Sequence, residues 1–146
     1  MPISYTDLQA AEDVNYRFVP DIIELARGVD VLVVAASGGT GSQNLVSADV
    51  LDALGPEGLL INVARGSVVD EQALVTALAQ GRLGGAGLDV FANEPRVPEA
   101  LWSMEQVVLQ PHRASATLET RADMGDVLVA NLAAHFTGQV PSAAVA

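Results

Sequence analysis

The sequence predicts an α/β fold built on a mostly parallel, doubly wound sheet. Two continuous apolar runs, Val29–Ala36 and Gly58–Ala64, have the composition of strands that are buried on both faces. Segments with the apolar spacing of helices lie between them and after them, each preceded by a residue that can cap a helix, Ser47 or Asp70. Strands that alternate with helices in this way indicate a parallel sheet.

The strands are expected where short apolar runs lie between turn residues. In chain order they are Ile3–Thr6, Tyr16–Val19, Val29–Ala36, Gly58–Ala64, Leu88–Phe91 and Val107–Leu109. The glycine-rich segment Gly84–Gly87 is expected to pack closely against its neighbours just before the fifth of these strands.

The helices are expected where apolar residues recur at helical spacing and a capping or breaking residue follows. The first, Pro20–Ala26, ends before Gly28, and the last covers Leu118–Phe136 with large apolar residues one turn apart. The helix that Ser47 caps is expected to end at Gly55, and the helix that Asp70 caps is expected to end at Gly81.

Composition and charge exclude several classes of function. The chain has 146 residues and a net charge of −11, so neither nucleic acid nor an anionic membrane is expected as a partner. All seven basic residues are arginine and cysteine is absent, which excludes Schiff-base lysines, thiol nucleophiles and cysteine-ligated metals. Neither a secretory signal nor a membrane-spanning run is expected, and a cytoplasmic protein is the default interpretation.

Three polar side chains stand just past apolar runs. Arg65 follows the run that ends at Ala64, Glu94 lies in the segment Gly87–Pro95, and His112 follows the last expected strand. The carboxyl ends of parallel strands share one edge of a sheet, and open α/β sheets bind their ligands there. We therefore expect a reaction centre that contains an arginine, an acid and a histidine.

The segment Asn62–Gly66 and the two later polar segments resemble the D-isomer-specific 2-hydroxyacid dehydrogenase family, in particular its glyoxylate/hydroxypyruvate and hydroxyphenylpyruvate reductases. The motifs occur in the family's order over almost the whole chain, from about Ile3 to Gly138. The resemblance implies that residues 1–138 are the C-terminal portion of a Rossmann-type NAD-binding domain. It also implies reduction of a small 2-keto acid by hydride transfer from a nicotinamide cofactor.

The resemblance implies a role for each of the three polar residues. Arg65 would hold the carboxylate and the carbonyl oxygen of the substrate, as a planar guanidinium can do with two hydrogen bonds. His112 would donate the proton to the carbonyl oxygen, and Glu94 would pair with His112 and favour its charged form. Taken alone, Arg65 could be a surface ion-pair residue and Glu94 a solvated turn acid. No metal is expected in the site.

The resemblance also implies a set of cofactor-binding residues. Ala64 and Arg65 would lie beside the cofactor, and Asp89 would meet the nicotinamide carboxamide. Asp7, at the end of the first expected strand, would bond the adenosine ribose and repel a 2′-phosphate, so NAD is expected rather than NADP. Read without the resemblance, Asp7 and Asp89 are acids of a turn or a loop.

The family's glycine-rich turn and the strand before it are not found in this sequence, which changes the expected sheet. In the strand order 3-2-1-4-5-6, strand one lies between strands two and four. Ile3–Thr6 and Val29–Ala36 would then lack their shared neighbour. The first segment is expected to be displaced, to pair directly with Val29–Ala36, or to pair with another chain.

Two functions stay open at this point. The sequence is interpreted as the C-terminal fragment of a dehydrogenase that acts on a 2-keto or 2-hydroxy acid, without the substrate domain and with a loose tail at residues 139–146. The alternative is a catalytically incompetent structural or dimerisation module that keeps the half-fold, and a homodimer is open in either case. The loop Ser37–Ser42 departs from the family's pattern and is interpreted as a flexible turn.

Overall fold

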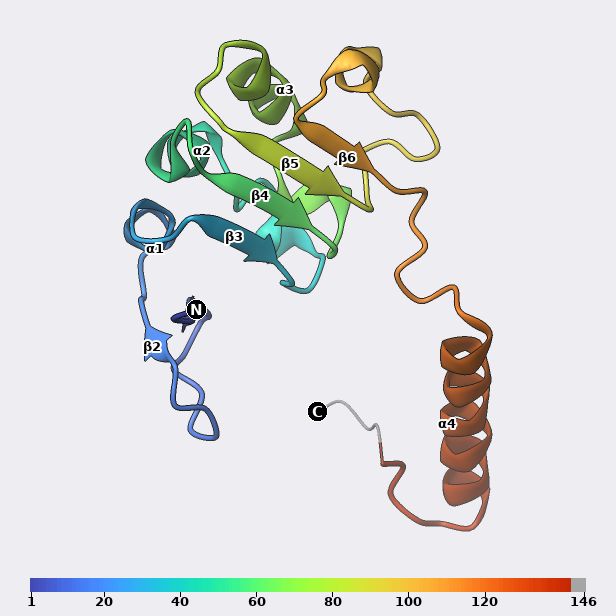
Figure 1. Ribbon diagram of the computed structural model, residues 1–146. Helices are drawn as coiled ribbons and strands as arrows, with labels where there is room; N and C mark the ends of the chain where they lie inside the picture. Colours follow the sequence, from blue (N-terminus) through green and yellow to red (C-terminus); the bar gives the residue numbers. More distant parts are fainter. Residues whose placement is uncertain (143–146) are drawn as a thin grey trace. The chain divides into compact units, whose positions relative to one another are not determined.

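The computed structural model describes residues 1–142 and has an α/β fold (Figure 1). Its main sheet has four parallel strands in the order β3-β4-β5-β6. These strands are β3 (Val31–Val34), β4 (Leu59–Asn62), β5 (Gly85–Leu88) and β6 (Val107–Leu109). Because neighbouring strands are also consecutive along the chain, their carboxyl ends lie in sequence order along one edge of the sheet.

Three helices connect these strands or precede them. They are α1 (Ile22–Arg27), α2 (Ala48–Leu54) and α3 (Glu71–Ala79). The carboxylates of Asp21 and Asp70 accept backbone N–H groups in the first turns of α1 and α3, whereas Ser47 precedes α2 without a side-chain capping bond. Short 3₁₀ helices cover Thr40–Ser42, Gly66–Val68 and Glu99–Ser103.

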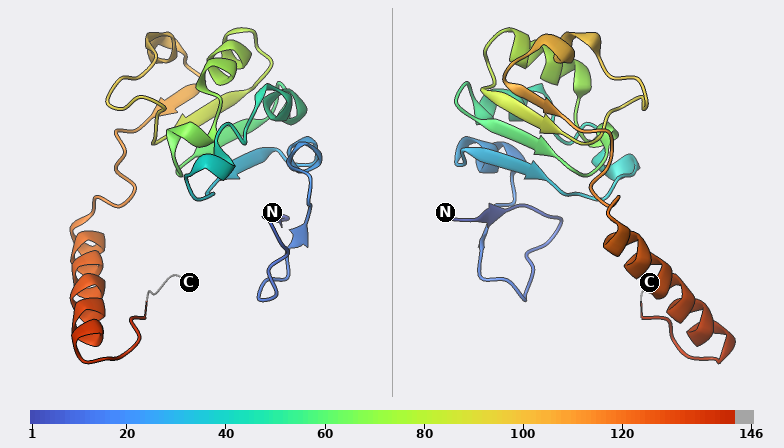
Figure 2. Two further views of the ribbon diagram at one scale, coloured as in Figure 1. Left: turned by 180° about the vertical axis from the view of Figure 1, so that it is seen from behind. Right: turned by 45° about the vertical axis from the view of Figure 1, so that its right-hand side comes forward.

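The core lies on one face of the main sheet. In β3, Leu32 and Val34 are buried while Val33 between them is exposed, and in β4 Leu60 and Asn62 are buried while Leu59 is exposed. The buried face forms a single apolar cluster with residues of all three helices, among them Leu51 and Leu74. Figure 2 shows the sheet and these helices from two further sides.

The first two strands form a separate sheet. β1 (Ser4–Tyr5) and β2 (Arg17–Phe18) pair in parallel, and neither strand pairs with β3. Of the three arrangements expected for the N-terminal segment, direct pairing with the first strand of the main sheet is therefore not adopted. No strand among the described residues lies between β1 and β3 in either sheet.

The fifth strand of the chain differs from the one that the sequence predicts. It covers Gly85–Leu88 rather than Leu88–Phe91, so the glycine-rich segment is itself the strand. A Cβ added to Gly85 would lie 2.7 Å from the carbonyl oxygen of Gln106, and one on Gly87 would lie 2.9 Å from the Cδ1 atom of Ile61. The lack of side chains lets the neighbouring strands approach closely, and the chain leaves the sheet after Leu88.

The chain divides into two compact units, Met1–His112 and Arg113–Ala146, and each is described by itself. The second unit contains α4 (Leu118–Phe136), as expected from its apolar spacing. The hydroxyl of Thr117 caps this helix by accepting the N–H of Thr120, and Gly138 follows the helix with a φ of 73°. Residues 143–146, the end of the tail expected to be loose, lie outside the described part of the chain.

Candidate active site

The loop after β4 is shaped by a buried asparagine. Asn62 is 1% exposed, and its side-chain oxygen accepts the N–H of Ala64 at 3.1 Å while its side-chain nitrogen donates to the carbonyl of Arg65 at 3.1 Å. These two hydrogen bonds hold the backbone where it leaves the sheet. Arg65 therefore projects from a restrained loop at the carboxyl edge, and its own Nη1 donates to the Ala64 carbonyl at 2.6 Å.

Three loops converge around Arg65. A Cβ on Gly66 would lie 1.9 Å from the carbonyl carbon of Phe91, so the loop after β4 lies directly against the segment after β5. A Cβ on Gly38 would lie 2.8 Å from Cγ of Arg65, so the loop after β3 also touches this side chain. The hydroxyl of Ser42 closes that loop by donating to a backbone carbonyl at its start, 2.6 Å away.

Glu94 and His112 form a hydrogen-bonded ion pair at the same edge. Nδ1 of His112 lies 2.8 Å from Oε2 of Glu94, and Oε1 of Glu94 accepts the N–H of Phe91 at 3.0 Å. The pair engages Nδ1, so Nε2 is the ring nitrogen that faces away from the carboxylate. Both side chains are partly open to solvent, at 45% for His112 and 36% for Glu94.

The charges of the site act on Glu94. The hydrogen bond from His112 lowers the pKa of the Glu94 carboxyl below its ordinary value of 4.5, and the bond from the Phe91 N–H acts in the same direction. Partial burial opposes this shift, while the positive charges of His112 and Arg65 add to it. The three expected catalytic side chains are therefore close enough to interact electrostatically.

A cavity of about 330 Å³ adjoins the ion pair. Its walls are mainly apolar, with the carboxylate and the imidazole as the ionisable groups. It is lined by Phe91, Glu94, Pro95, Val97, Leu109, Gln110, Pro111 and His112. A cavity of this size and character suits a small organic ligand held by a few polar groups.

The expected cofactor residues are divided between the two sheets. Asp89 directly follows β5, is 7% exposed, and donates its backbone N–H to the carbonyl of Asn62 at 3.0 Å, so it lies beside the loop that carries Ala64 and Arg65. Asp7 follows β1 on the two-stranded sheet, is exposed, and accepts the N–H of the next residue at 2.7 Å. All the expected site residues except Asp7 therefore follow strands of the main sheet.

One supporting residue was not found from the sequence. Glu71, the first residue of α3, accepts the backbone N–H of Ala92 at 3.0 Å and so holds the segment that leads to Glu94. In the sequence Glu71 has the pattern of an ordinary acid in the first turn of a helix. No neighbouring residue indicates that it also binds the backbone of Ala92.

Residues 1–142 contain neither a cluster of His, Asp or Glu side chains suited to a metal ion nor a helix long and apolar enough to cross a membrane.

Comparison with known proteins gives a consistent set of relatives. The family model for the D-isomer specific 2-hydroxyacid dehydrogenase, NAD binding domain, matches residues 1–114. A hydroxyphenylpyruvate reductase of Plectranthus scutellarioides is 51% identical over 138 residues, which are 94% of this chain and 44% of the relative. A glyoxylate/hydroxypyruvate reductase A of Arabidopsis thaliana is 50% identical with the same coverage.

Solved structures agree with these relatives. An NADPH-dependent glyoxylate/hydroxypyruvate reductase from Sinorhizobium meliloti, in complex with NADP and malonate, superposes with a TM-score of 0.88 at 51% identity. The match covers 92% of this chain and 42% of that one. The chain therefore spans less than half the length of the relatives that it matches.

Proposed function

Because the chain belongs to the D-isomer specific 2-hydroxyacid dehydrogenase family, we propose that it carries the cofactor side of a site that reduces a small 2-keto acid of the glyoxylate or hydroxypyruvate type. The observation that carries this proposal is the His112–Glu94 pair, 2.8 Å apart and within the electrostatic influence of Arg65. An acid-paired histidine and an arginine are the groups that proton transfer to a 2-keto acid requires.

Each of these residues has a separate task in the proposed reaction. The guanidinium of Arg65 binds the substrate carboxylate and polarises the adjacent carbonyl. His112 donates the proton from Nε2 to the carbonyl oxygen, and Glu94 orients the ring through Nδ1. When bound, the nicotinamide cofactor supplies the hydride that adds to the carbonyl carbon.

The residues present fit the nicotinamide end of such a cofactor. The crevice at the carboxyl ends of parallel strands is where open α/β sheets bind nucleotides. Asp89 lies there beside the loop that carries Ala64 and Arg65, and a carboxylate is the type of group that accepts a hydrogen bond from a carboxamide. We further propose that NAD is preferred to NADP because Asp7 would repel a 2′-phosphate, although the Sinorhizobium meliloti relative is described with NADP.

Binding and turnover can be measured on the chain itself. We expect NADH to bind more tightly than NADPH in calorimetric titrations, and Asp7→Ser to reduce that difference. With glyoxylate or hydroxypyruvate, oxidation of NADH should fall about 10²-fold or more in His112→Gln. His135→Gln, which changes the histidine in α4, is the matched control and should leave the rate unchanged.

Two outcomes would contradict the proposal. A folded chain that neither binds NADH nor oxidises it would favour the structural or dimerisation module instead. Equal and measurable rates of NADH oxidation for His112→Gln and the unchanged chain would show that the His112–Glu94 pair does not take part in proton transfer.

A further inference from the structure

The backbone of Phe91 and Ala92 is held by three contacts. The N–H of Ala92 donates to Oε2 of Glu71 at 3.0 Å, and the N–H of Phe91 donates to Oε1 of Glu94 at 3.0 Å. The third contact is with Gly66, where an added Cβ would lie 1.9 Å from the carbonyl carbon of Phe91. Two consecutive backbone donors therefore bind two different carboxylates, while the loop after β4 packs against the peptide group between them.

Glu71 and Arg65 lie on one short stretch of the chain. Between them is the 3₁₀ helix Gly66–Val68, whose Val68 side chain is buried in the core. Glu71 then begins α3. The hydrogen bond from Ala92 to Glu71 therefore ties the segment after β5 to the same stretch that carries the arginine of the site.

The two carboxylate oxygens of Glu94 connect this backbone to His112. Oε1 is held by the N–H of Phe91, and Oε2 lies 2.8 Å from Nδ1 of His112. The backbone of His112 has a φ of 51°, in the left-handed region that residues with a side chain rarely adopt. Such a conformation persists where the surrounding contacts hold it. The position of the imidazole thus depends on the carboxylate, and the carboxylate depends on the backbone of Phe91.

The charge of Glu71 does not account for the lowered pKa of Glu94. The causes that lower this pKa are the hydrogen bonds from His112 and from the Phe91 N–H, and the positive charges of His112 and Arg65. Because Glu71 and Glu94 carry the same sign, a direct interaction between them would raise the pKa of Glu94. An influence of Glu71 that lowers this pKa must therefore pass through the backbone that the two carboxylates share.

We propose that Glu71 is a positioning residue for the reaction described above. By holding the N–H of Ala92, it fixes the carboxylate of Glu94. Through that carboxylate it fixes the distance between the imidazole of His112 and the guanidinium of Arg65. These two groups follow different strands, β6 and β4, so their separation depends on contacts between loops. The effect on turnover rests on the proposed function, whereas the effect on Glu94 does not.

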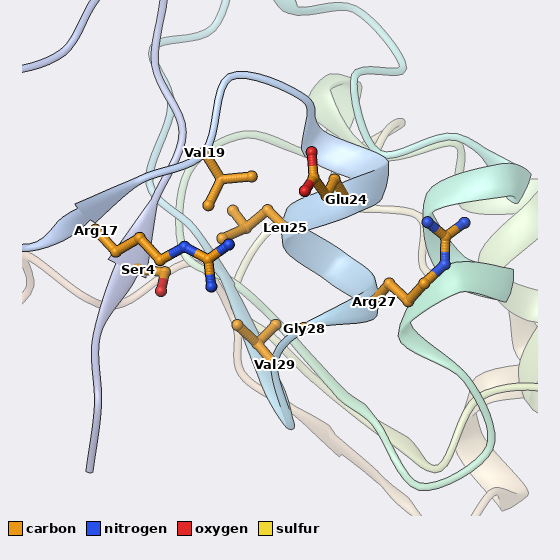
Figure 3. Close-up of a pocket in the computed structure, with 8 residues that line it drawn as sticks. All are labelled: Ser4, Arg17, Val19, Glu24, Leu25, Arg27, Gly28 and Val29. Atoms are coloured by element: carbon orange, nitrogen blue, oxygen red, sulfur yellow. The ribbon is translucent and has the colours of Figure 1, made fainter.

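Two substitutions separate the hydrogen bond of Glu71 from its charge. Glu71→Ala removes the acceptor, whereas Glu71→Gln loses the charge but keeps a side-chain oxygen that can accept the N–H of Ala92. Glu24→Ala is the matched control, because Glu24 is also an acid in the first turn of a helix. Figure 3 shows Glu24 on α1, beside a cavity that residues of the two-stranded sheet also line.

NMR of the full chain without cofactor tests the positioning by itself. In Glu71→Ala, the amide of Ala92 should exchange at least about tenfold faster. The pKa of Glu94, measured from its carboxyl carbon, should rise because the N–H of Phe91 is no longer held against it. Loss of the negative charge alone would act in the opposite direction and lower this pKa. Glu71→Gln and Glu24→Ala should keep the slow exchange and should not raise the pKa.

Steady-state oxidation of NADH with glyoxylate tests the effect on the reaction. Glu71→Ala should lower kcat at least about tenfold, because small displacements of catalytic groups are costly. The KM for the keto acid should change by less than about twofold, because Asn62 still restrains the loop that carries Arg65. Glu71→Gln should restore most of kcat, and Glu24→Ala should leave both parameters unchanged. A role in stability alone would alter neither the pKa of Glu94 nor kcat in the folded chain.

Three results would overturn the proposal. The first is an unchanged pKa of Glu94 in folded Glu71→Ala, and the second is an equal rise in Glu71→Gln, which keeps the acceptor. The third is an unchanged kcat of Glu71→Ala in a chain that oxidises NADH. A chain in which the pKa rises as expected but which does not oxidise NADH would instead contradict the proposed function, and would support the positioning of Glu94 by Glu71.

Discussion

Replacing Gly66 with alanine tests whether the site depends on contact between two backbone segments. A Cβ at this position would lie 1.9 Å from the carbonyl carbon of Phe91 and 2.3 Å from the nitrogen of Ala92. Favourable carbon contacts begin at about 3.5 Å, so the segments must separate by about 1.6 Å. Both partners are backbone, and no change of rotamer relieves the overlap. Overpacking costs about 1–3 kcal/mol, and we expect the upper end of that range.

Urea unfolding followed by circular dichroism measures this cost. With an m value of about 1–3 kcal/mol/M, a loss of about 3 kcal/mol lowers the unfolding midpoint of Gly66→Ala by about 1–3 M. Gly41→Ala is the matched control in the same unit, because a Cβ there has no atom within 4 Å and φ is outside the left-handed region. Its free energy of unfolding should change by less than about 0.5 kcal/mol.

The reasoning fails if Gly66→Ala and Gly41→Ala have the same midpoint. That result would mean that the loops after β4 and β5 do not touch. The position of Arg65 relative to Glu94, on which the proposed reaction depends, would then be wrong.

Three further changes test the parts of the site and the fold separately. Asn62→Ala removes both hydrogen bonds that hold the loop after β4 and should lower the free energy of unfolding by about 2 kcal/mol in the same assay; a change below about 0.5 kcal/mol would contradict this role. His112→Ala should raise the pKa of Glu94, measured by NMR of its carboxyl carbon, because the histidine is the largest cause of the lowered value. Since that pKa is lowered in the folded chain, the pair stabilises the fold above the ordinary glutamate pKa, and this contribution is lost as the pH falls through the lowered value. Asp21→Ala should cost about 1 kcal/mol, whereas Ser47→Ala, which removes no capping bond, should change nothing measurable.

Most of the fold could be predicted because apolar runs and caps are local signals. The strand at Gly85–Leu88 could not, since a glycine-rich segment has no apolar signature of its own. Its position is set by its neighbours, because Ile61 and the backbone of Gln106 leave no room for side chains at Gly85 and Gly87. The apolar residues Val90 and Phe91 that follow have the composition of a strand, but the chain has left the sheet after Leu88.

The site shows the same division between local and distant information. Arg65, Glu94 and His112 could be found from their places after apolar runs and from their resemblance to a family, and the expected pairing of Glu94 with His112 is present. The contact of Glu71 with the segment before Glu94 joins residues 21 positions apart, and it depends on how α3 packs. No pattern of neighbouring residues encodes such a contact.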